Sequence, residues 1–365
     1  MKCEEGGRKR RGLAEWLKSR GGTVTFREFM QAALYDPQQG YYSTTIRDVG
    51  AAGDFSTSST IHPVLAQAVA HWILETAPRL FSWGQGLNLI EVGAGNGAMA
   101  RDVLKALPWR SRWHARLHLV EESPAFRALQ QQRLRGWQVT WHDSLKEALA
   151  ACHGRALIYS NELVDAFPCN LFERRGGIWR EVGLMAGDDW VRECLMDIPP
   201  NLTAPEQFSI WEAWVAVEEG QRAAIHDSYR EWLGAWSGQL EAGAVLTIDY
   251  GAGAEDLCRG RPSGAVRAYF QHQVLEDKAV YQRFGLQDLT ADVNFTDLER
   301  WGGQAGWSTE FYVNQAEFIR SRVSTAASTI EDMLRIRQLT EEHGAGGSFK
   351  VLCQSRGLAA KQFSC

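Results

Sequence analysis

The 365-residue sequence contains no apolar run of the roughly 18 residues that a membrane-spanning helix requires. Its seven cysteines are far apart and form no C-x-x-C pair, so neither a disulfide framework nor a zinc site is indicated, and we expect no bound metal. With a net charge of −5, the chain also lacks the excess of Lys and Arg that binds nucleic acid electrostatically. What remains is a globular protein with reduced thiols, and its 45% hydrophobic residues are enough for a sizeable core.

The first residues carry no recognisable targeting signal. The basic stretch from Arg8 to Arg11 is interrupted by acids at Glu4, Glu5 and Glu15, and no apolar segment follows it. A secretory signal needs such a segment, and a mitochondrial transit peptide is poor in acids. We therefore expect a cytoplasmic protein, or a matrix protein if the host is eukaryotic.

The most informative stretch is Leu87–Leu107, which predicts a buried strand, a glycine turn and then a helix. The turn holds Gly93, Gly95 and Gly97. Glycines allow a sharp turn and let a ligand approach the bare main chain, while the helix N-terminus presents unpaired N–H groups. This arrangement holds nucleotide-like cofactors at the edge of a parallel sheet.

Two cofactors fit the glycine turn as a pattern. GAGNGA satisfies the loose dinucleotide fingerprint, but Glu91 precedes the three glycines at the strand end. A carboxylate there would repel a pyrophosphate, whereas it suits the sulfonium cation of S-adenosylmethionine. Glu91 therefore favours S-adenosylmethionine over a nicotinamide dinucleotide.

Three further strands end on polar residues. Arg116–Val120 is followed by Glu121, at the distance from the glycine turn where a ribose-binding carboxylate is expected. Gln138–His142 is followed by Asp143, which could reach an adenine amino group; equally, Asp143-Ser144 before a helix is typical of an N-cap. Arg155–Tyr159 leads into a polar segment that faces the crevice of such a sheet and contains Asn161, Glu162 and Asp165.

The long segment Leu34–Ser59 contains closely spaced aromatic and turn residues. Long loops in compact domains are often functional, so Gly53 and Asp54 are candidates to face the cofactor. The alternative is that this segment only packs against the domain. Before it, Thr25 and Glu28 predict a capping box at the start of a helix.

The order of predicted elements indicates an α/β fold with a doubly wound, mostly parallel, seven-stranded sheet, an N-terminal helical flap and an inserted subdomain. Within the insertion, Cys169–Met196 predicts hairpins and Phe208–Leu240 predicts one or two helices. Arg267–Asn294 is expected to be mostly loop and short helix. The expected boundaries are 1–59 for the flap and lid, 60–168 for the cofactor core, 169–243 for the insertion, 244–356 for completion of the sheet, and 357–365 for a tail.

Eight blocks of the sequence, in order from about Gly22 to Arg356, resemble the MidA-type family of class I S-adenosylmethionine-dependent methyltransferases. That family comprises the mitochondrial complex I assembly methyltransferase and its bacterial relatives. The blocks are TFREFMQAALYDPQQGYY, GDFSTSS, LIEVGAGNGAMARDVL, LVEESPAFRALQ, SNELVDAFPCNLF, LTIDYG, LTADVNFTDL and GGSFKVL. GDF, SNELVDAFP and IDYG are far more specific than the glycine turn.

The resemblance implies a site for S-adenosyl-L-methionine and a methyl acceptor. The positions that match the family's cofactor blocks are Gly53, Asp54, Glu91, Gly93, Gly95, Gly97 and Glu121. Asn161, Glu162 and Asp165 match the block that faces the transferred methyl group. The chain departs from the family at Ser59-Thr60 and Val64-Leu65, along the expected substrate face, which bears on the acceptor more than on the cofactor.

Mitochondrial members methylate an arginine of an NADH dehydrogenase subunit, so the resemblance implies a protein acceptor, such as a respiratory-complex subunit. Carboxylates must then hold the guanidinium fork, and we expect Glu162 to do so, with Asp165 second and Asn161 orienting. Asp165 is equally interpreted as a helix N-terminal charge. A small-molecule acceptor, and an assembly factor that binds the cofactor without turnover, remain alternatives. A nicotinamide-dependent oxidoreductase is disfavoured by Glu91 and by the family blocks.

Overall fold

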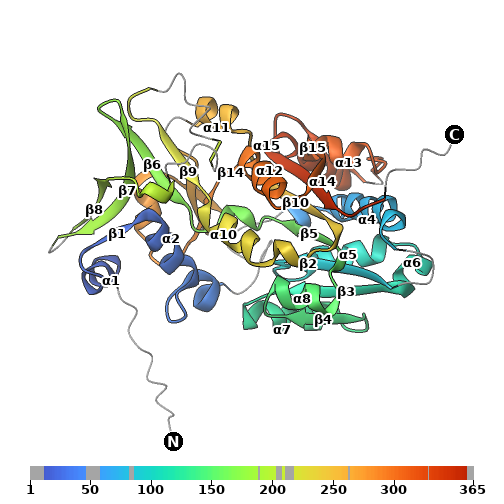
Figure 1. Ribbon diagram of the computed structural model, residues 1–365. Coiled ribbons are helices and arrows are strands. Elements are labelled where there is room, and N and C mark those ends of the chain that lie inside the picture. The colour runs from blue at the N-terminus through green and yellow to red at the C-terminus, as the bar shows by residue number, and fades with distance from the viewer. Residues whose placement is uncertain are drawn as a thin grey trace, which may run out of the picture.

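The computed structural model describes residues 12–46, 58–81, 86–187, 190–202, 208–209, 218–261, 264–327 and 329–359. These residues form three sheets (Figure 1). Gly53 and Asp54 lie outside the described residues. No helix among the described segments is both long and apolar enough to cross a membrane.

The central sheet has eight strands and is mixed. Seven of them follow the order β15-β16-β10-β5-β2-β3-β4, and β14 pairs with the end of β10. β16 runs antiparallel to both of its neighbours, and the other described pairings are parallel. The strands are β2 (Leu87–Val92), β3 (Ala115–Val120), β4 (Val139–His142), β5 (Arg155–Asn161), β10 (Ala242–Ala252), β14 (Val293–Asn294), β15 (Ser308–Asn314) and β16 (Phe349–Arg356). The predicted α/β class is confirmed, and the short β14 is an additional strand.

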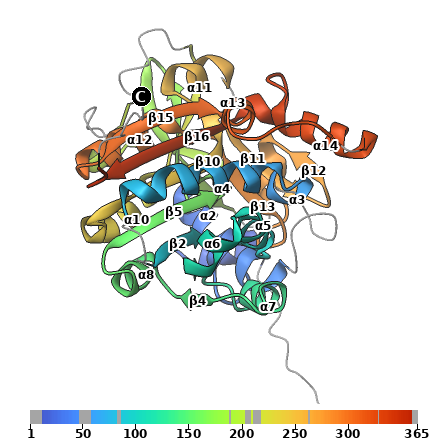
Figure 2. The ribbon, with the colours of Figure 1, turned by 90° about the vertical axis from the view of Figure 1, so that its right-hand side faces the viewer.

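Successive side chains of a strand point to opposite faces of the sheet, and here they pack into two separate hydrophobic cores. Leu89 of β2 belongs to the core beneath α4 (Val64–Thr76) and α5 (Ala98–Ala106). Its neighbour Ile90 belongs to the core beneath α8 (Leu145–Ala151), α10 (Asp227–Trp236) and α12 (Phe295–Gln304). Figure 2 shows α4 lying across one face of the sheet, and α13 (Gln315–Arg320) and α14 (Ile330–Thr340) add to the same core.

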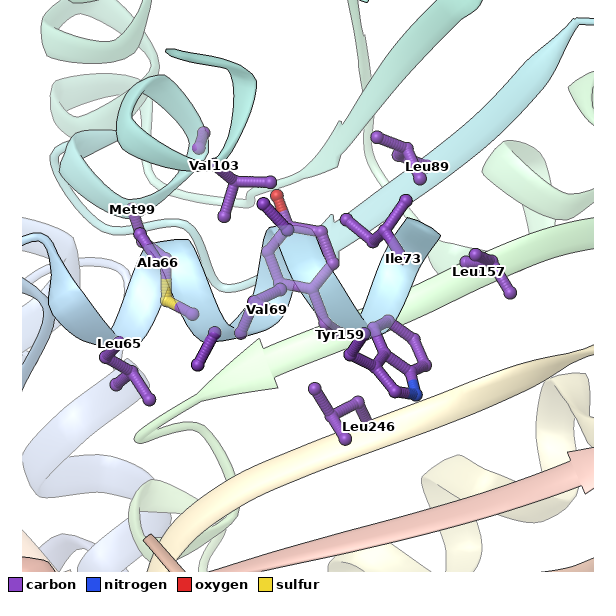
Figure 3. Close-up of a cluster of buried hydrophobic side chains, with 14 of the residues drawn as sticks. Leu65, Ala66, Val69, Ile73, Leu89, Met99, Val103, Leu157, Tyr159 and Leu246 are labelled. Carbon is purple, nitrogen blue, oxygen red and sulfur yellow. The ribbon is translucent and has the colours of Figure 1, made fainter. Parts of the chain in front are cut away.

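Tyr159 is one of the largest side chains in the first core and carries a polar hydroxyl. It is fully buried, and Figure 3 shows its ring among Val69, Ile73 and Leu246. A buried tyrosine needs a partner for its hydroxyl, and here that partner is Glu91 of the neighbouring strand, at 2.9 Å. The hydrophobic core thereby fixes the carboxylate at the end of β2.

The second sheet combines the N-terminal segment with the insertion. Its strands are β1 (Thr23–Thr25), β6 (Asn170–Arg175), β7 (Ile178–Ala186), β8 (Val191–Met196) and β9 (Arg222–Ile225). β1 pairs with β7 and can approach closely because Gly183 has no Cβ, which would lie 2.6 Å from the carbonyl oxygen of Val24. The hairpins predicted within Cys169–Met196 are therefore present, and the flap is paired to them.

One prediction of local structure is wrong and another is incomplete. Within Phe208–Leu240, the described part is not wholly helical, because Arg222–Ile225 pairs with β6 as β9 before α10 begins. Arg267–Asn294 contains the expected loops and a short helix, but β11 (Val266–Phe270), β12 (Gln273–Leu275) and β13 (Asp288–Ala291) also form a third sheet that the sequence pattern does not predict. Gln271 and His272 make the hairpin turn with φ of 48° and 61°, so the usual Gly or Asn signal is missing.

The N-terminal helices α1 (Leu13–Ser19) and α2 (Phe26–Tyr35) belong to a third core, shared with the second and third sheets. They lie beside the second sheet, away from the C-terminus (Figure 1). The predicted capping box is confirmed, since Thr25 and Glu28 satisfy each other's backbone N–H groups. Remaining elements are η1 (Tyr41–Thr45), α3 (Ser58–Ile61), η2 (Ala77–Arg79), α6 (Trp109–His114), α7 (Pro124–Arg133), η3 (Val164–Ala166), η4 (Pro200–Leu202), η5 (Ser237–Gln239), α11 (Ala254–Gly260), η6 (Asp277–Tyr281) and α15 (Ala345–Ser348).

The capping box gives a direct test of how the N-terminal helices are held. Thr25→Ala removes the side-chain acceptor of the Glu28 N–H group, so we expect the free energy of unfolding to fall by about 1 kcal/mol. Thr23→Ala, on the exposed face of the same short strand, is the matched control and is expected to change little. Urea unfolding followed by circular dichroism measures both. Equal effects of the two variants would contradict a capping role.

Candidate functional site

A pocket of about 1390 Å³ opens where β2, β3, β5 and β10 end. Its lining includes Gly93 and Gly95 after β2, Glu121 after β3, and Tyr250 at the end of β10. The carboxyl ends of parallel strands meet at one edge of a sheet, which is where ligands bind in open α/β folds. The segment after β5 completes this edge with Asn161, Glu162 and Asp165.

The glycine turn has the backbone that its sequence predicts. Gly93, Gly95 and Gly97 have φ of 68°, 53° and 77°, in the left-handed region that favours glycine. A Cβ on Gly93 would lie 2.8 Å from the side chain of Leu163. Gly93 and Gly95 line the pocket, whereas Gly97 is outside the lining and sits at the N-cap of α5.

Glu91 and Glu121 lie on this side of the pocket. Burial raises the pKa of Glu91 to about 8, against the effect of the hydrogen bond from Tyr159. Burial also raises the pKa of Glu121 to about 7. Glu121 accepts hydrogen bonds from the Ser123 N–H group at 3.0 Å and from the Gln130 amide at 3.1 Å. Both carboxylates are thus costly to keep charged without a cationic or donor-rich ligand.

Sequence reasoning missed the role of Gln130. Its amide nitrogen donates to the Gly95 carbonyl oxygen at 2.7 Å as well as to Glu121, and its oxygen accepts from Trp141 at 2.9 Å. It lies about two turns into α7 from the N-cap Ser123, on the helix face that meets the glycine turn. A fully buried glutamine therefore joins the glycine turn to the acid of the next strand.

Asp143 does not lie in the pocket. Its side chain is 79% exposed and forms an ion pair with Arg127, which also donates to the backbone oxygens of Glu121 and His142. Ser144, the next residue, accepts the hydrogen bond of the α8 N-cap. The alternative that Asp143-Ser144 forms the N-cap of the next helix is therefore confirmed, with Ser144 as the capping residue, and Asp143 is not among the residues that line the pocket.

The turn after β5 carries the second group of carboxylates. Glu162 has φ of 53°, and its Oε1 accepts from the Ser58 N–H group at 2.7 Å and from the Asn161 amide at 3.0 Å. Burial, with the negative charge of Asp165, raises the pKa of Glu162 to about 8. Asn161 and α3 together orient this carboxylate at the pocket.

Asp249, which sequence reasoning left without a role, holds the turn in place. Its Oδ2 accepts hydrogen bonds from the backbone N–H groups of Leu163, Val164 and Asp165, at 3.1, 2.8 and 3.3 Å. Asp249 is completely buried, at the end of β10, one residue beyond the pair formed by Ile248 and Asn161. The available signal was the IDYG block, which places an acid at the end of the fifth strand.

Two buried oxygen atoms of this turn have no partner among the described residues. They are Oδ1 of Asn161 and Oδ1 of Asp165. The other oxygen of Asp165 accepts from the Tyr250 hydroxyl at 2.5 Å, and burial raises the pKa of Asp165 to about 6. Buried acceptors are normally satisfied, so these atoms indicate a ligand that donates hydrogen bonds.

The described lining of the pocket is strongly acidic. It contains nine carboxylates and three arginines, namely Glu91, Glu121, Glu122, Glu162, Asp165, Glu231, Asp256, Asp288 and Asp292, with Arg27, Arg261 and Arg267. Gathering like charges in a partly dehydrated space is unfavourable unless cations bind there. The site is therefore built for positively charged ligands, and a pyrophosphate would not suit it.

Proteins of known family are similar to this chain over most of its length. Residues 68–313 match the family model of S-adenosyl-L-methionine-dependent methyltransferases. The mitochondrial protein arginine methyltransferase NDUFAF7 homolog of Drosophila melanogaster is 28% identical over 315 residues, covering 78% of this chain and 68% of that protein. The mitochondrial protein arginine methyltransferase NDUFAF7 of Danio rerio is 25% identical over 322 residues, covering 77% and 69%.

Two crystal structures of proteins from Burkholderia thailandensis have the same fold. One, a methyl transferase bound to S-adenosyl-homocysteine, superposes with a TM-score of 0.82 at 26% identity and covers 95% of this chain and 92% of that chain. The other, a native structure of the same superfamily, has a TM-score of 0.77 at 25% identity and covers 95% and 91%.

These comparisons agree with the site. The matched region includes the glycine turn, Glu121, the turn after β5 and Asp249. The resemblance seen in the sequence blocks is confirmed, and so is S-adenosyl-L-methionine as the cofactor. The chain is an enzyme that belongs to the family of S-adenosyl-L-methionine-dependent methyltransferases.

Proposed function

We propose that the protein transfers a methyl group to the guanidinium of an arginine in a protein acceptor. The observation that carries this proposal is the acidic pocket, in which buried carboxylates and unpartnered oxygens continue from the glycine turn to Asp165. A guanidinium presents several N–H donors and a positive charge, so it satisfies both needs. The relatives' names, protein arginine methyltransferase, support the same acceptor.

The residues at the glycine turn fit S-adenosyl-L-methionine. When bound, this cofactor supplies an electrophilic methyl group on a sulfonium cation. We propose that Gly93, Gly95 and Gly97 shape the backbone that it contacts, that Glu121 accepts from its ribose hydroxyls, and that Glu91 offsets its positive charge. Asp143 has no part in this proposal. For Gly53 and Asp54, the proposed cofactor-facing role is supported only by the family block in which they lie.

At the other end of the pocket, we propose that Glu162 and Asp165 hold the guanidinium fork. Charge-assisted hydrogen bonds to a carboxylate fix the position of a planar cation, and correct alignment of reactants can supply roughly 7–11 kcal/mol of the barrier reduction. Asn161 donates to Glu162 and so orients it. These residues position the attacking nitrogen and keep positive charge on the other two nitrogens.

The acceptor protein itself is a further part of the proposal. The family resemblance favours a subunit of a respiratory complex, and the relatives are named as mitochondrial. We propose a cytoplasmic location, or the matrix in a eukaryotic host. The oligomeric state is not part of the proposal.

The cofactor assignment is tested with Gly95→Val. A β-branched side chain at φ of 53° is strained and fills the space beside the turn, so we expect binding of S-adenosyl-L-methionine and S-adenosylhomocysteine to be lost. Gly136→Val, at φ of 89° in an exposed turn outside the pocket, is the matched control and should bind normally. Calorimetric titration measures both, with NADH as the negative ligand. NADH binding to the wild type would contradict the assignment.

The acceptor assignment is tested with Glu162→Gln. We expect this variant to bind cofactor normally but to methylate on the order of 10²-fold more slowly, because the guanidinium is misaligned. Mass spectrometry of proteins captured from cells should find one or two methyl groups on arginine with the wild type. Unchanged turnover in the variant would remove Glu162 from this role. A methylated small molecule, with no modified arginine, would overturn the protein acceptor.

The raised pKa of Glu91 predicts a pH-dependent stability. This pKa is about 8 in the folded protein against an ordinary 4.5, so the wild type loses stability as pH rises from 4.5 to 8. Glu91→Gln cannot ionise and still offers an oxygen to Tyr159. Without ligand, we expect it to be more stable than the wild type above pH 8 by about 1–3 kcal/mol, and by much less near pH 5. Urea unfolding at both pH values would contradict this if the difference were constant.

A further inference from the structure

A carboxylate on the third sheet belongs to the same pocket as Asp165. Asp288, the first residue of β13, is 2% exposed and lines the pocket. β13 packs against η3, the short helix that contains Asp165. Burial, followed by the negative charge of Asp165, raises the pKa of Asp288 well above its usual range. Two carboxylates, one from η3 and one from the third sheet, thus repel each other within one pocket.

Each of these carboxylates has one oxygen held and one oxygen open. Tyr250 donates to Oδ2 of Asp165, while Tyr42 at 2.9 Å and the Leu289 N–H group at 3.0 Å donate to Oδ1 of Asp288. Oδ1 of Asp165 is buried without a partner. No hydrogen bond from the described residues reaches Oδ2 of Asp288. Each carboxylate therefore leaves one oxygen as an acceptor for a ligand.

The arginines of the described lining do not neutralise this pair. Arg27 forms ion pairs with Asp227 and Glu231. Arg261 and Arg267 both pair with Asp292. The charge of Arg267 also lowers the pKa of Asp165, but each of these three arginines forms its ion pairs with other carboxylates, and no ion pair between described residues reaches Asp165 or Asp288.

The wall next to the pair is aromatic and comes from the N-terminal segment. The rings of Tyr35 and Tyr42 stack with centroids 5.5 Å apart and an interplanar angle of 27°. The Tyr35 hydroxyl donates to the carbonyl oxygen of Ala166 at 2.9 Å, which ties this wall to η3. Flat rings beside carboxylates suit a planar, delocalised cation better than a compact ammonium.

We propose that Asp165 and Asp288 form a subsite that clamps the acceptor guanidinium between η3 and β13, with Tyr42 positioning Asp288. This inference rests on the proposed function and deepens it, because it assigns the choice of arginine over lysine to a residue outside the cofactor-binding sheet. The N-terminal segment then forms part of the acceptor site as well as packing against the domain.

The test uses the full chain saturated with S-adenosylhomocysteine. N-acetyl-arginine amide is titrated and followed by NMR, beside the lysine compound and the citrulline compound, which has the shape of arginine without its charge. We expect the wild type to bind the arginine compound at least tenfold more tightly than the other two. Asp288→Asn should lose that preference, and Tyr42→Phe should weaken it in part. Asp277→Asn, an exposed residue with φ of 52° that suits Asn, is the matched control.

Binding of S-adenosylhomocysteine by each variant shows that it is folded. Equal binding of the arginine and citrulline compounds by the wild type would overturn the subsite, as would no binding of the arginine compound. A folded Asp288→Asn that keeps the arginine preference would overturn it too. By contrast, a wild type that binds arginine through Asp288 but methylates no arginine supports the subsite and overturns the proposed function.

Discussion

The site depends on one buried carboxylate that accepts hydrogen bonds from successive backbone N–H groups. Asp249, at the end of β10, holds the turn from Leu163 to Asp165 that follows the neighbouring strand β5. Without the Asp249 carboxylate, the same path of the turn would leave these three N–H groups unpaired, and an unpaired buried N–H group costs about 1–3 kcal/mol. Because the turn is fixed, Glu162 can sit at a left-handed φ and Asp165 can point an open oxygen into the pocket.

The second organising feature is charge that the protein does not neutralise itself. Glu91, Glu121, Glu162 and Asp165 all have raised pKa values, and burial is the largest cause for each. A protein under selection for stability alone would have no reason to gather them in one pocket. A methyltransferase does, because its sulfonium cofactor brings a positive charge, and the acceptor that we propose brings a second one. On this proposal, the carboxylates that destabilise the ligand-free protein are the groups that make binding selective for cations.

The parts added to the central sheet are therefore more than covering layers. The N-terminal segment, the inserted hairpins and the third sheet share one hydrophobic core, which sets Tyr35, Tyr42 and Asp288 around the pocket. In our proposal, the central sheet supplies the cofactor side and, through the turn after β5, Glu162 and Asp165, while these additions supply Asp288 and the aromatic wall beside it. Such a division would let the acceptor side change while the cofactor side is kept.

The sequence by itself determined the α/β class, the cofactor and the carboxylates at the strand ends, because strand–glycine–helix patterns and capping boxes are local signals. It misjudged Arg222–Ile225 because the partner strand β6 is distant in the chain. It did not predict the sheet around Val266–Phe270 because the hairpin turn at Gln271 and His272 lacks Gly or Asn. In the sequence, Glu121 and Asp143 each follow a strand. Only the tertiary structure shows that Asp143 is exposed and paired with Arg127, whereas Glu121 lines the pocket. The roles of Gln130, Asp249 and Asp288 were likewise decided by tertiary structure. A polar side chain's partner depends on which elements fold against it, and spacing along the chain does not contain that information.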